Sequence, residues 1–483
     1  MLRAALFAVL ASLVLPAHAQ SLELEECRIS AGPGYPGIKA RCGTVLRPQN
    51  PGDPASPDIT LRVAVVPALN LNPATDPVVP LAGGPGQGAV QFYSAYAAAF
   101  EPMRRNRDIL LVDQRGTGES SRMDCPIEDD ILEGEYSVEE TVRYTNDCLD
   151  QLPHDPAWFT TSVAVNDLEA VRVSLGYSAL NLYGVSYGTR VAQHFARRYP
   201  DSTRSVVLDG VVPPQLALGP EIATESQKAV DNILARCAAD AACNERFPGV
   251  RESFSSLVEE LRAEPRQLSV PNPSTGRPEN LSFGANEFAG AIRLLAYSPR
   301  SIALVPLLVH EAANGNLVPL ASQYLMTAVA LADSLSLGMH NSIMCNEDVP
   351  FYDKATIDYE GIEASYMGAL QVEALEAICS VWPEGPVDAE FKVPLATDLP
   401  VLLLSGDADP ITPPRYAELA MVDLDNARHI IGRHQGHGQI GVGCTRRIVA
   451  DFIDTADLDG MEADCLERSF VMPFFLDFSG PGP

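Results

Sequence analysis

The sequence predicts an α/β fold with a mostly parallel, doubly wound sheet and a large, mainly helical lid domain inserted before one of the last strands. Three observations predict this fold. Short apolar runs typical of strands alternate with helical stretches between residues 77 and 208. The alternation stops at about Leu216, and helical patterns continue to about Ala396. It then resumes with an uninterrupted apolar run from Pro400 to Ser405, which is typical of a strand buried on both faces.

The individual elements follow from the spacing of apolar residues and from turn residues. Two alternating runs, at 38–47 and 59–66, flank a Pro-rich turn and are expected to pair antiparallel. The other expected strands are at 77–82, 108–112, 179–183, 205–208, 400–405 and 427–431, with core helices at 164–175 and 186–199. Apolar residues at helical spacing predict lid helices at 221–239, 251–263, 285–296, 302–314 and 317–334.

The first nineteen residues have the composition of a secretory signal peptide. Arg3 supplies the positive charge, Ala4 to Leu15 form a short apolar run, and Ala17-His18-Ala19 matches a cleavage site. We therefore expect an exported protein, in a periplasm or outside the cell, without a membrane span. The expected division is 1–19 signal peptide, 20–215 first part of the core, 216–396 lid domain and 397–483 second part of the core.

The cysteine content agrees with export, and the net charge argues against one class of partner. Ten cysteines follow the expected cleavage site, and an even number in an exported chain predicts disulfides. Pairing between neighbours along the chain is the simplest arrangement, although the sequence leaves the connectivity open. With 34 basic against 63 acidic residues, the net charge of −29 opposes binding to nucleic acids.

Gly184-Val185-Ser186-Tyr187-Gly188 matches the pattern G-x-S-x-G. It lies directly between an expected strand and an expected helix, where a tight turn pushes the serine hydroxyl out of the end of the sheet. Glycines two places either side avoid clashes with neighbouring backbone. Ser186 is therefore the predicted nucleophile of an α/β-hydrolase.

A serine hydroxyl needs a base, and the base needs an acid that orients it. In α/β-hydrolases these follow in the order serine, acid, histidine. Asp409 comes after the strand at 400–405 and is the predicted acid, with Asp407 as a rival better suited to capping the turn. His437, in Gly-His-Gly after the last strand, is the predicted base; His434 and His429 are alternatives.

The tetrahedral intermediate of acyl transfer needs backbone N–H donors for its oxyanion. Tyr187, next to the nucleophile, is expected to supply one. Gly84, in the loop GGPGQG at residues 83–88, is expected to supply the other. This loop lacks the Gly-Lys-Ser/Thr ending of a P-loop and the spacing of a dinucleotide fingerprint. We interpret Asp113 and Arg115 in DQRGTGES as residues that lie under the loop at 83–88 and fix it.

Together these segments resemble the proline iminopeptidase and tripeptidyl aminopeptidase branch of the α/β-hydrolases, and most closely its secreted, disulfide-bearing members. The matching segments are GGPGQG (83–88), DQRGTGES (113–120), the stretch 167–200, SIMCNED (342–348), GDADPITPP (406–414) and GHG (436–438). The resemblance implies hydrolysis from a free amino end by Ser186, Asp409 and His437. Many iminopeptidases have a histidine where this chain has Ala82, which weakens any specific expectation of proline.

Members of that branch hold the ammonium group of the substrate with carboxylates of the lid. The resemblance places this role on Glu347 and its neighbour Asp348, with Glu221 and Glu225 as weaker candidates. A solvated or capping role for Glu347 remains the alternative. Two carboxylates facing a small cavity would attract an ammonium group strongly once water is excluded.

The expected function is that of a serine aminopeptidase that removes residues or short peptides through an acyl-enzyme. A carboxylesterase using the same triad is the alternative, because the chemistry does not distinguish amides from esters. A lid rich in Glu and Asp favours a cationic peptide end over a lipid. A binding protein that merely retains the fold is a third class, disfavoured by the complete triad. We expect no cofactor and no metal, and the sequence does not indicate the oligomeric state.

Overall fold

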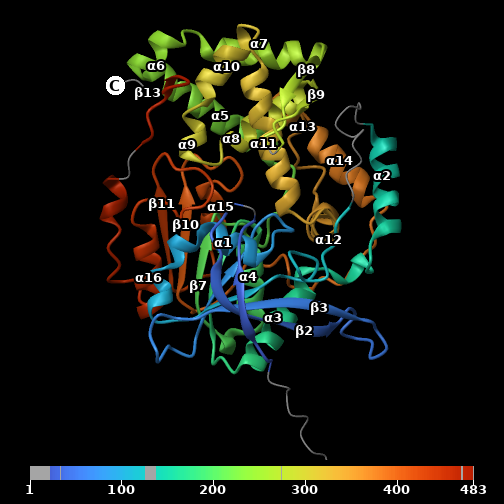
Figure 1. The fold of residues 1–483 in the computed structure, drawn as a ribbon, viewed down its shortest axis with the longest axis vertical. Coiled ribbons are helices and arrows are strands. Elements are labelled where there is room, and N and C mark those ends of the chain that lie inside the picture. Colours follow the sequence, from blue (N-terminus) through green and yellow to red (C-terminus); the bar gives the residue numbers. More distant parts are fainter. Residues whose placement is uncertain (1–21, 33, 126–136, 274, 469–470, 482–483) are drawn as a thin grey trace, which may run out of the picture.

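The computed structural model describes residues 22–32, 34–125, 137–273, 275–468 and 471–481 (Figure 1). The expected signal peptide, residues 1–19, lies outside the described residues. Among the helices of the described part, none combines the length and the apolar character that crossing a membrane requires.

A nine-stranded sheet forms the centre of the lower half of the molecule (Figure 1). Its order is β1–β2–β3–β5–β4–β6–β7–β10–β11, antiparallel from β1 to β5 and parallel from β5 to β11. The strands are β1 (Glu25–Ile29), β2 (Ile38–Pro48), β3 (Asp58–Val66), β4 (Val78–Leu81), β5 (Ile109–Val112), β6 (Leu180–Val185), β7 (Thr203–Asp209), β10 (Val401–Gly406) and β11 (Ala427–Gly432). The mostly parallel sheet is confirmed, and β1 is a strand that the sequence analysis missed.

Helices cover both faces of this sheet. Successive side chains of a strand point to opposite faces, so Val401 and Leu403 join one hydrophobic cluster with α3 and α4, whereas Leu402 and Leu404 join another with α1 and α16. The helices around the sheet are α1 (Ala89–Phe100), α2 (Val138–Gln151), α3 (Thr161–Leu175), α4 (Tyr187–Arg198), α15 (Pro414–Ala420) and α16 (Thr445–Thr455), with short 3₁₀ turns η1 (Met103–Arg105), η3 (Pro156–Trp158), η4 (Pro200–Ser202) and η6 (Asp464–Arg468). Burial on both faces explains why the strand at 401–406 is apolar without interruption.

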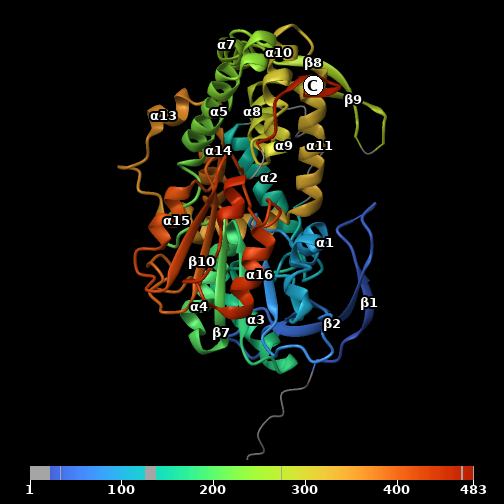
Figure 2. The ribbon, with the colours of Figure 1, turned by 90° about the vertical axis from the view of Figure 1, so that its left-hand side faces the viewer.

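Between β7 and β10 the chain forms a mainly helical insert, which lies above the sheet in both ribbon views (Figures 1 and 2). Its helices are α5 (Ile222–Ala239), α6 (Ala241–Arg246), α7 (Val250–Ala263), α8 (Ala285–Leu295), α9 (Pro299–Ile302), α10 (Val305–Ala313), α11 (Val318–Ser334), α12 (Leu337–Glu347), α13 (Tyr359–Ala364) and α14 (Leu370–Cys379), with the 3₁₀ turn η5 (Val349–Phe351). The helix expected at 302–314 begins slightly later, at Val305, because Pro306 lies in the first turn of α10, where proline favours a helix start.

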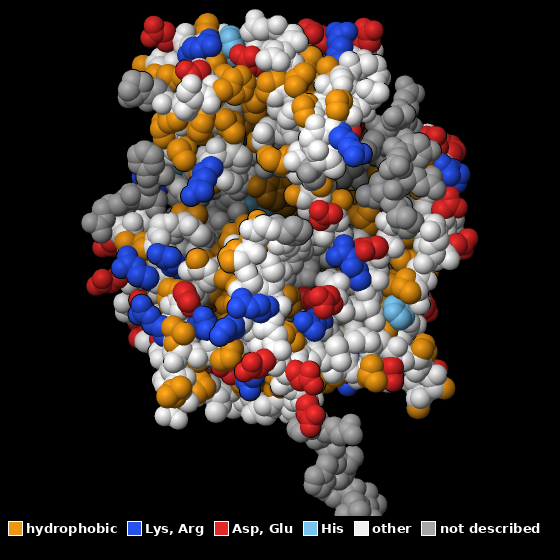
Figure 3. Space-filling model, in the orientation of Figure 1, with side chains coloured by type: hydrophobic (Ala, Val, Ile, Leu, Met, Phe, Trp, Pro, Cys, Tyr) orange, Lys and Arg blue, Asp and Glu red, His pale blue; other side chains and the backbone are white. Residues whose placement is uncertain are grey.

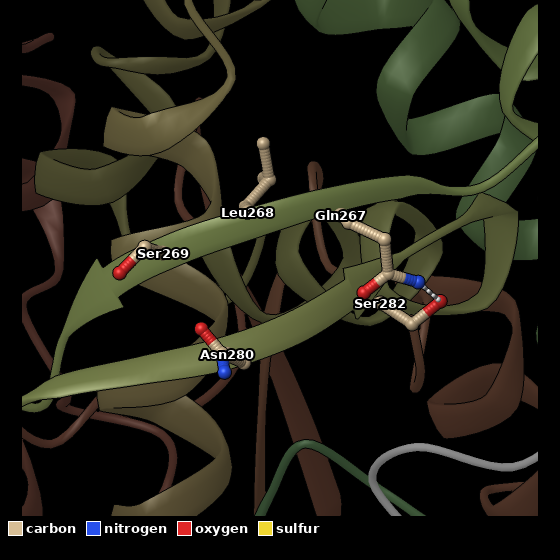
Figure 4. Close-up of a pocket in the computed structure, with 5 residues that line it drawn as sticks. All are labelled: Gln267, Leu268, Ser269, Asn280 and Ser282. Atoms are coloured by element: carbon tan, nitrogen blue, oxygen red, sulfur yellow. Dashed lines mark hydrogen bonds between the residues drawn. The ribbon is translucent and has the colours of Figure 1, made fainter.

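The insert also contains a β-hairpin that the sequence analysis did not predict. Strands β8 (Arg266–Pro271) and β9 (Pro278–Phe283) pair antiparallel at the outer end of the insert, away from the sheet (Figure 1). Its side chains border a shallow, largely polar hollow, where Gln267 Nε2 donates to Ser282 Oγ over 3.1 Å (Figure 4).

The helices of the insert belong to different hydrophobic clusters. Helices α5, α7, α8 and α10 and the first half of α11 share a separate cluster. Met339 and Ile343 of α12 belong instead to the cluster that the sheet forms with α3 and α4, so α12 is packed as part of the core. The C-terminal hairpin, β12 (Phe475–Asp477) and β13 (Gly480–Pro481), packs on the insert through Phe474 and a hydrogen bond from Phe475 N to Ala303 O of 3.0 Å. The last residues of the segment 397–483, which the sequence analysis assigned to the core, therefore pack on the insert instead.

All ten cysteines form disulfides between neighbours along the chain. The pairs are Cys27–Cys42, Cys125–Cys148, Cys237–Cys243, Cys345–Cys379 and Cys444–Cys465. This is the simplest pairing that the sequence allowed. Five disulfides are typical of a protein exported from the reducing cytosol.

Candidate active site

Ser186 stands at the turn between β6 and α4, with backbone angles φ 56° and ψ −127°. This conformation is strained for a residue with a side chain and occurs at functional turns. The flanking glycines are required by space, because a Cβ on Gly188 would collide with the carbonyl of Leu81 and one on Gly184 with the backbone of Gly188. The structure thus places Ser186 in the sharp strand-to-helix turn that the sequence predicted.

Asp409 and His437 come from the loops after β10 and β11, which are neighbours in the sheet. His437 Nδ1 lies 2.8 Å from Asp409 Oδ2. Burial alone would lower the pKa of His437, but the charge and the hydrogen bond of Asp409 raise it above its ordinary value. Because Nδ1 is engaged with the acid, Nε2 is the nitrogen that remains for a substrate or a nucleophile.

Thr412, which the sequence analysis missed, contacts both members of this pair. Its hydroxyl donates to Asp409 Oδ2 over 2.7 Å and lies 3.0 Å from His437 Nδ1. The amides of Ile411 and Thr412 donate to Asp409 Oδ1, each over 2.9 Å. Burial would raise the pKa of Asp409, but His437 and these hydrogen bonds hold it below its ordinary value. The acid is therefore ionised and fully oriented.

Asp209, at the end of β7, connects the serine turn with the histidine loop and was also missed. Its carbonyl accepts a hydrogen bond of 2.9 Å from Ser186 N. Its buried carboxylate accepts from the amides of Gln439 (2.8 Å) and Ile440 (3.0 Å) and from the hydroxyl of Tyr183 (2.5 Å). Burial raises the pKa of Asp209 to about 6, although these donors lower it. One side chain thus holds the loop of His437 against the strand beside Ser186.

The loop at 83–88 follows β4, the strand on the other side of β6 from β7. Gly83 packs directly on the serine, since a Cβ added there would lie 2.9 Å from Ser186 Cβ and 3.5 Å from Ser186 Oγ. The insert holds the loop from outside: Ser336 N donates to Gly86 O over 3.0 Å, and His340 Nδ1 lies 3.3 Å from Pro85 O.

The expected oxyanion donors lie on the two sides of Ser186. Gly84 belongs to the loop just described, and Tyr187 is the first residue of α4, whose N–H has no partner within the helix. The Tyr187 hydroxyl lies 2.5 Å from the hydroxyl of Thr161 and accepts from Gln114 Nε2 over 2.9 Å. Tyr187 is therefore fixed through its side chain, and its backbone with it.

Asp113 contacts the end of the 83–88 loop as we predicted, whereas the contacts of Arg115 lie elsewhere. Asp113 accepts from the amide of Val90, just after the 83–88 loop, over 2.9 Å. Arg115 is completely buried and donates to Asp167 Oδ2 over 2.7 Å and to two backbone carbonyls. Asp113 therefore fixes the junction of the loop and α1, whereas Arg115 joins the end of β2 to α3.

Comparison with known proteins agrees with this geometry. The family described as "TAP-like protein" (Abhydrolase_4) matches residues 364–465, which include Asp409 and His437. Serine protease Hip1 of Mycobacterium tuberculosis is 26% identical over 455 residues, covering 85% of this chain and 83% of that protein. The chain thus resembles the TAP-like proteins over residues 364–465 and a serine protease over most of its length.

Shorter matches lie within the same group. A tripeptidyl aminopeptidase of Streptomyces lividans is 30% identical over 152 residues, which cover 27% of this chain and 28% of that protein. A proline iminopeptidase of Xylella fastidiosa is 30% identical over 145 residues, which cover 29% and 34% of the two chains. These similarities support an enzyme of the serine hydrolase and peptidase type.

The two acids expected to hold a substrate ammonium group, Glu347 and Asp348, are completely buried. Asp348 pairs with two cations, Arg190 (2.8 Å) and Lys392 (3.2 Å). Glu347 instead accepts from neutral donors, the amide (2.6 Å) and hydroxyl (2.8 Å) of Thr161.

The different partners have opposite effects on the two carboxyls. Burial would raise the pKa of Asp348, but Arg190 and Lys392 hold it below its ordinary value. Burial raises the pKa of Glu347 to about 7, although Arg190 and Thr161 lower it. Asp348 is therefore paired directly with two cations, whereas Glu347 is hydrogen-bonded by neutral donors alone.

The two weaker candidates, Glu221 and Glu225, share one cation at the start of α5. Arg415 Nη2 lies 2.8 Å from Glu221 Oε2 and 3.0 Å from Glu225 Oε1. Tyr416 also donates to Glu221, over 2.6 Å. These contacts tie the first helix of the insert to α15 of the core.

Proposed function

We propose that this protein cleaves residues or short peptides from the free amino end of peptides, through an acyl-enzyme on Ser186. The observation that carries the proposal is the arrangement around one sheet end: a strained serine after β6, with an oriented histidine–aspartate pair from the loops after β11 and β10. The similarity to a serine protease along 85% of the chain supports peptides as substrates.

Each group has a defined role in the proposed reaction. His437 Nε2 takes the proton of Ser186 Oγ as that oxygen attacks the scissile carbonyl, and Asp409 stabilises the imidazolium. The amides of Gly84 and Tyr187 donate to the oxyanion of the tetrahedral intermediate. His437 then protonates the leaving amine, and the acyl-enzyme forms. A water molecule activated by the same histidine releases the acyl part.

The amino end of the substrate is proposed to be held by Glu347. Its two hydrogen-bond donors are neutral, so an ammonium group would be the first cation hydrogen-bonded to it, although the charge of Arg190 already acts on it. Asp348 lies next to it and is neutralised by Arg190 and Lys392. A buried carboxylate with a pKa near 7 is ionised in mildly alkaline solution, where the anchor would be strongest.

The free amino end is tested with aminoacyl-, dipeptidyl- and tripeptidyl-aminomethylcoumarins, each with a free and an acetylated amino group. We expect acetylation to lower kcat/KM by at least about 100-fold for the preferred length, because a desolvated ammonium–carboxylate pair is lost. Equal turnover of both forms contradicts the exopeptidase proposal. Efficient turnover of simple acyl esters together with that result would favour the carboxylesterase alternative.

Replacing Glu347 by Gln tests the anchor itself. At pH 8 we expect Glu347→Gln to raise KM for free-amine peptides about tenfold or more and to leave short acyl esters unchanged. Glu221→Gln is the matched control, because this acid is half-exposed and paired with Arg415. Since Glu347 also reaches Tyr187 through Thr161, an equal loss of kcat on both substrate types would instead assign it to positioning the oxyanion donor.

The place of action is proposed to be a periplasm or the medium. The five disulfides require an oxidising compartment to form and persist. Reduction of the folded protein followed by a mobility shift on non-reducing gels would show whether the chain recovered from its native location carries them.

A further inference from the structure

Helix α11 has two halves with different surroundings. In the first half, Leu320, Ala321 and Leu325 are buried in the hydrophobic cluster of the insert. In the second half, every residue from 326 to 334 is exposed or only half-buried. Leu331 is 43% exposed and Met326 46%.

The second half is nevertheless apolar. Its sequence, MTAVALADS, contains a single charged residue, Asp333. A helix face in water is normally polar, and an apolar face without a protein partner marks a binding surface. Ala328 and Leu331 lie one helical turn apart on α11, and Leu335 is the extended residue that directly follows the helix. We call these three apolar residues the α11 stripe.

The α11 stripe ends at the candidate reaction centre. Leu335 forms an isolated β-bridge with Gln87 of the oxyanion loop. A Cβ added to Gly84 would lie 3.0 Å from Leu335 Cδ2, and the adjoining Gly83 packs on Ser186. Figure 3 shows a hollow between the upper and lower parts of the molecule with hydrophobic side chains in its wall. The stripe is therefore continuous with the site rather than a separate patch.

The order of the sheet indicates which part of a substrate meets this stripe. Ser186 follows β6; the oxyanion loop follows β4 on one side, and His437 follows β11 on the other. The leaving amine must lie beside His437, because it receives its proton there. The acyl part then extends to the opposite side, beneath the oxyanion loop and α11.

We infer that the α11 stripe binds an apolar side chain in the acyl part of the substrate, with Leu331 as its principal contact. The inference rests on the proposed function and names the substrate class: peptides whose released amino-terminal portion carries an aliphatic or aromatic side chain. Burial of such a side chain on Leu331 removes apolar surface of both partners from water.

The test uses pairs of free-amine peptidyl-coumarins that differ only in one acyl residue, leucine or the similarly shaped asparagine, at each position in turn. The wild-type protein is expected to prefer leucine at one position by about tenfold or more in kcat/KM. Leu331→Gln is expected to reduce that preference about tenfold and to leave the asparagine substrates within about twofold.

Val318→Gln is the matched control, because Val318 lies on the same helix, is 38% exposed and stands about 20 Å away along the helix axis. It should keep the wild-type preference. The inference is overturned if the wild-type protein shows no preference for leucine, if Leu331→Gln retains it, or if both variants lose it equally. Labelling of Ser186 by a fluorophosphonate, counted in every sample, separates these outcomes from failure of the proposed function: an active protein without a labelled serine would refute the function, not the stripe.

Discussion

The molecule contains two groups of serine, histidine and aspartate, and they differ in every property that nucleophilic catalysis needs. One consists of Ser186, His437 and Asp409 at the carboxyl end of the sheet. In the other, Ser162 Oγ lies 3.4 Å and Asp388 Oδ2 3.0 Å from His194 Nε2. The residue types are the same, so only geometry distinguishes the groups.

The first difference is the nitrogen that each acid contacts. Asp409 contacts Nδ1 of His437, which leaves the opposite side of the ring for a serine. Asp388 and Ser162 both contact Nε2 of His194, so no proton can pass across the ring from the serine to the acid. A relay requires the serine and the acid on different nitrogens.

The second difference is the setting of each group. Ser186 has a strained backbone at the strand-to-helix turn, whereas Ser162 is in the first turn of α3. Asp409 receives two amides and a hydroxyl, whereas Asp388 pairs with Arg198 over 2.8 Å. Burial lowers the pKa of His194, while Asp409 raises that of His437. The second group therefore has the features of a structural clamp that joins α3 and α4 to the segment between α14 and β10.

Replacing the two serines should give the largest contrast. We expect Ser186→Ala to lower kcat by about 10⁴-fold or more, because the covalent route is lost. Ser162→Ala should change kcat by less than about threefold and is the matched control. Both are measured on the preferred peptidyl-coumarin, with fluorophosphonate labelling of the folded proteins. Full activity of Ser186→Ala would refute the assignment of the nucleophile.

Replacing the two acids should give the next largest contrast. Asp409→Asn should lower kcat by about 10³-fold or more, since the amide cannot stabilise the imidazolium. Asp388→Asn should leave kcat within about threefold and lower the free energy of unfolding by about 1 kcal/mol, the scale of a partly exposed ion pair. Denaturant unfolding of both variants shows whether any loss of activity comes from loss of fold. A large loss of kcat in a fully folded Asp388→Asn protein would break the comparison.

The sequence could place Ser186, Asp409 and His437 at one end of the sheet for a physical reason. Ser186, Asp409 and His437 each follow directly after a strand, and the carboxyl ends of parallel strands meet at one edge. Two of the strands, at 180–185 and 401–406, are apolar enough to be recognised alone. Their catalytic roles remain predictions, whereas the hydrogen bond between His437 and Asp409 is a feature of the structure.

What the sequence could not predict depends on contacts between distant segments. Thr161 holds Glu347 from 186 residues away, and Asp209 holds the amide of Gln439 from 230 residues away. No local pattern marks such partners. Asp209 has one weak signal, an acid at the end of an apolar strand and before Gly210. Thr412 has another, a hydroxyl three residues after Asp409 in a turn, where it can bond back to the carboxylate.

The smallest expected contrast is between the pH dependences that are linked to His437 and to His194. His437 acts only when neutral, and Asp409 raises its pKa. With short acyl esters, which do not use the proposed Glu347 anchor, the acid limb of kcat/KM should therefore have its midpoint above about 6.5, the ordinary histidine value. His194 has a lowered pKa, so the unfolded chain binds more protons below about pH 6.5, and stability should fall as the pH falls through that range. His194→Gln should remove this part of the fall in Tm and leave the midpoint of the acid limb unchanged. If His194→Gln instead moved the acid limb, the two groups would be coupled, and the histidine that titrates in the reaction would have to be assigned again.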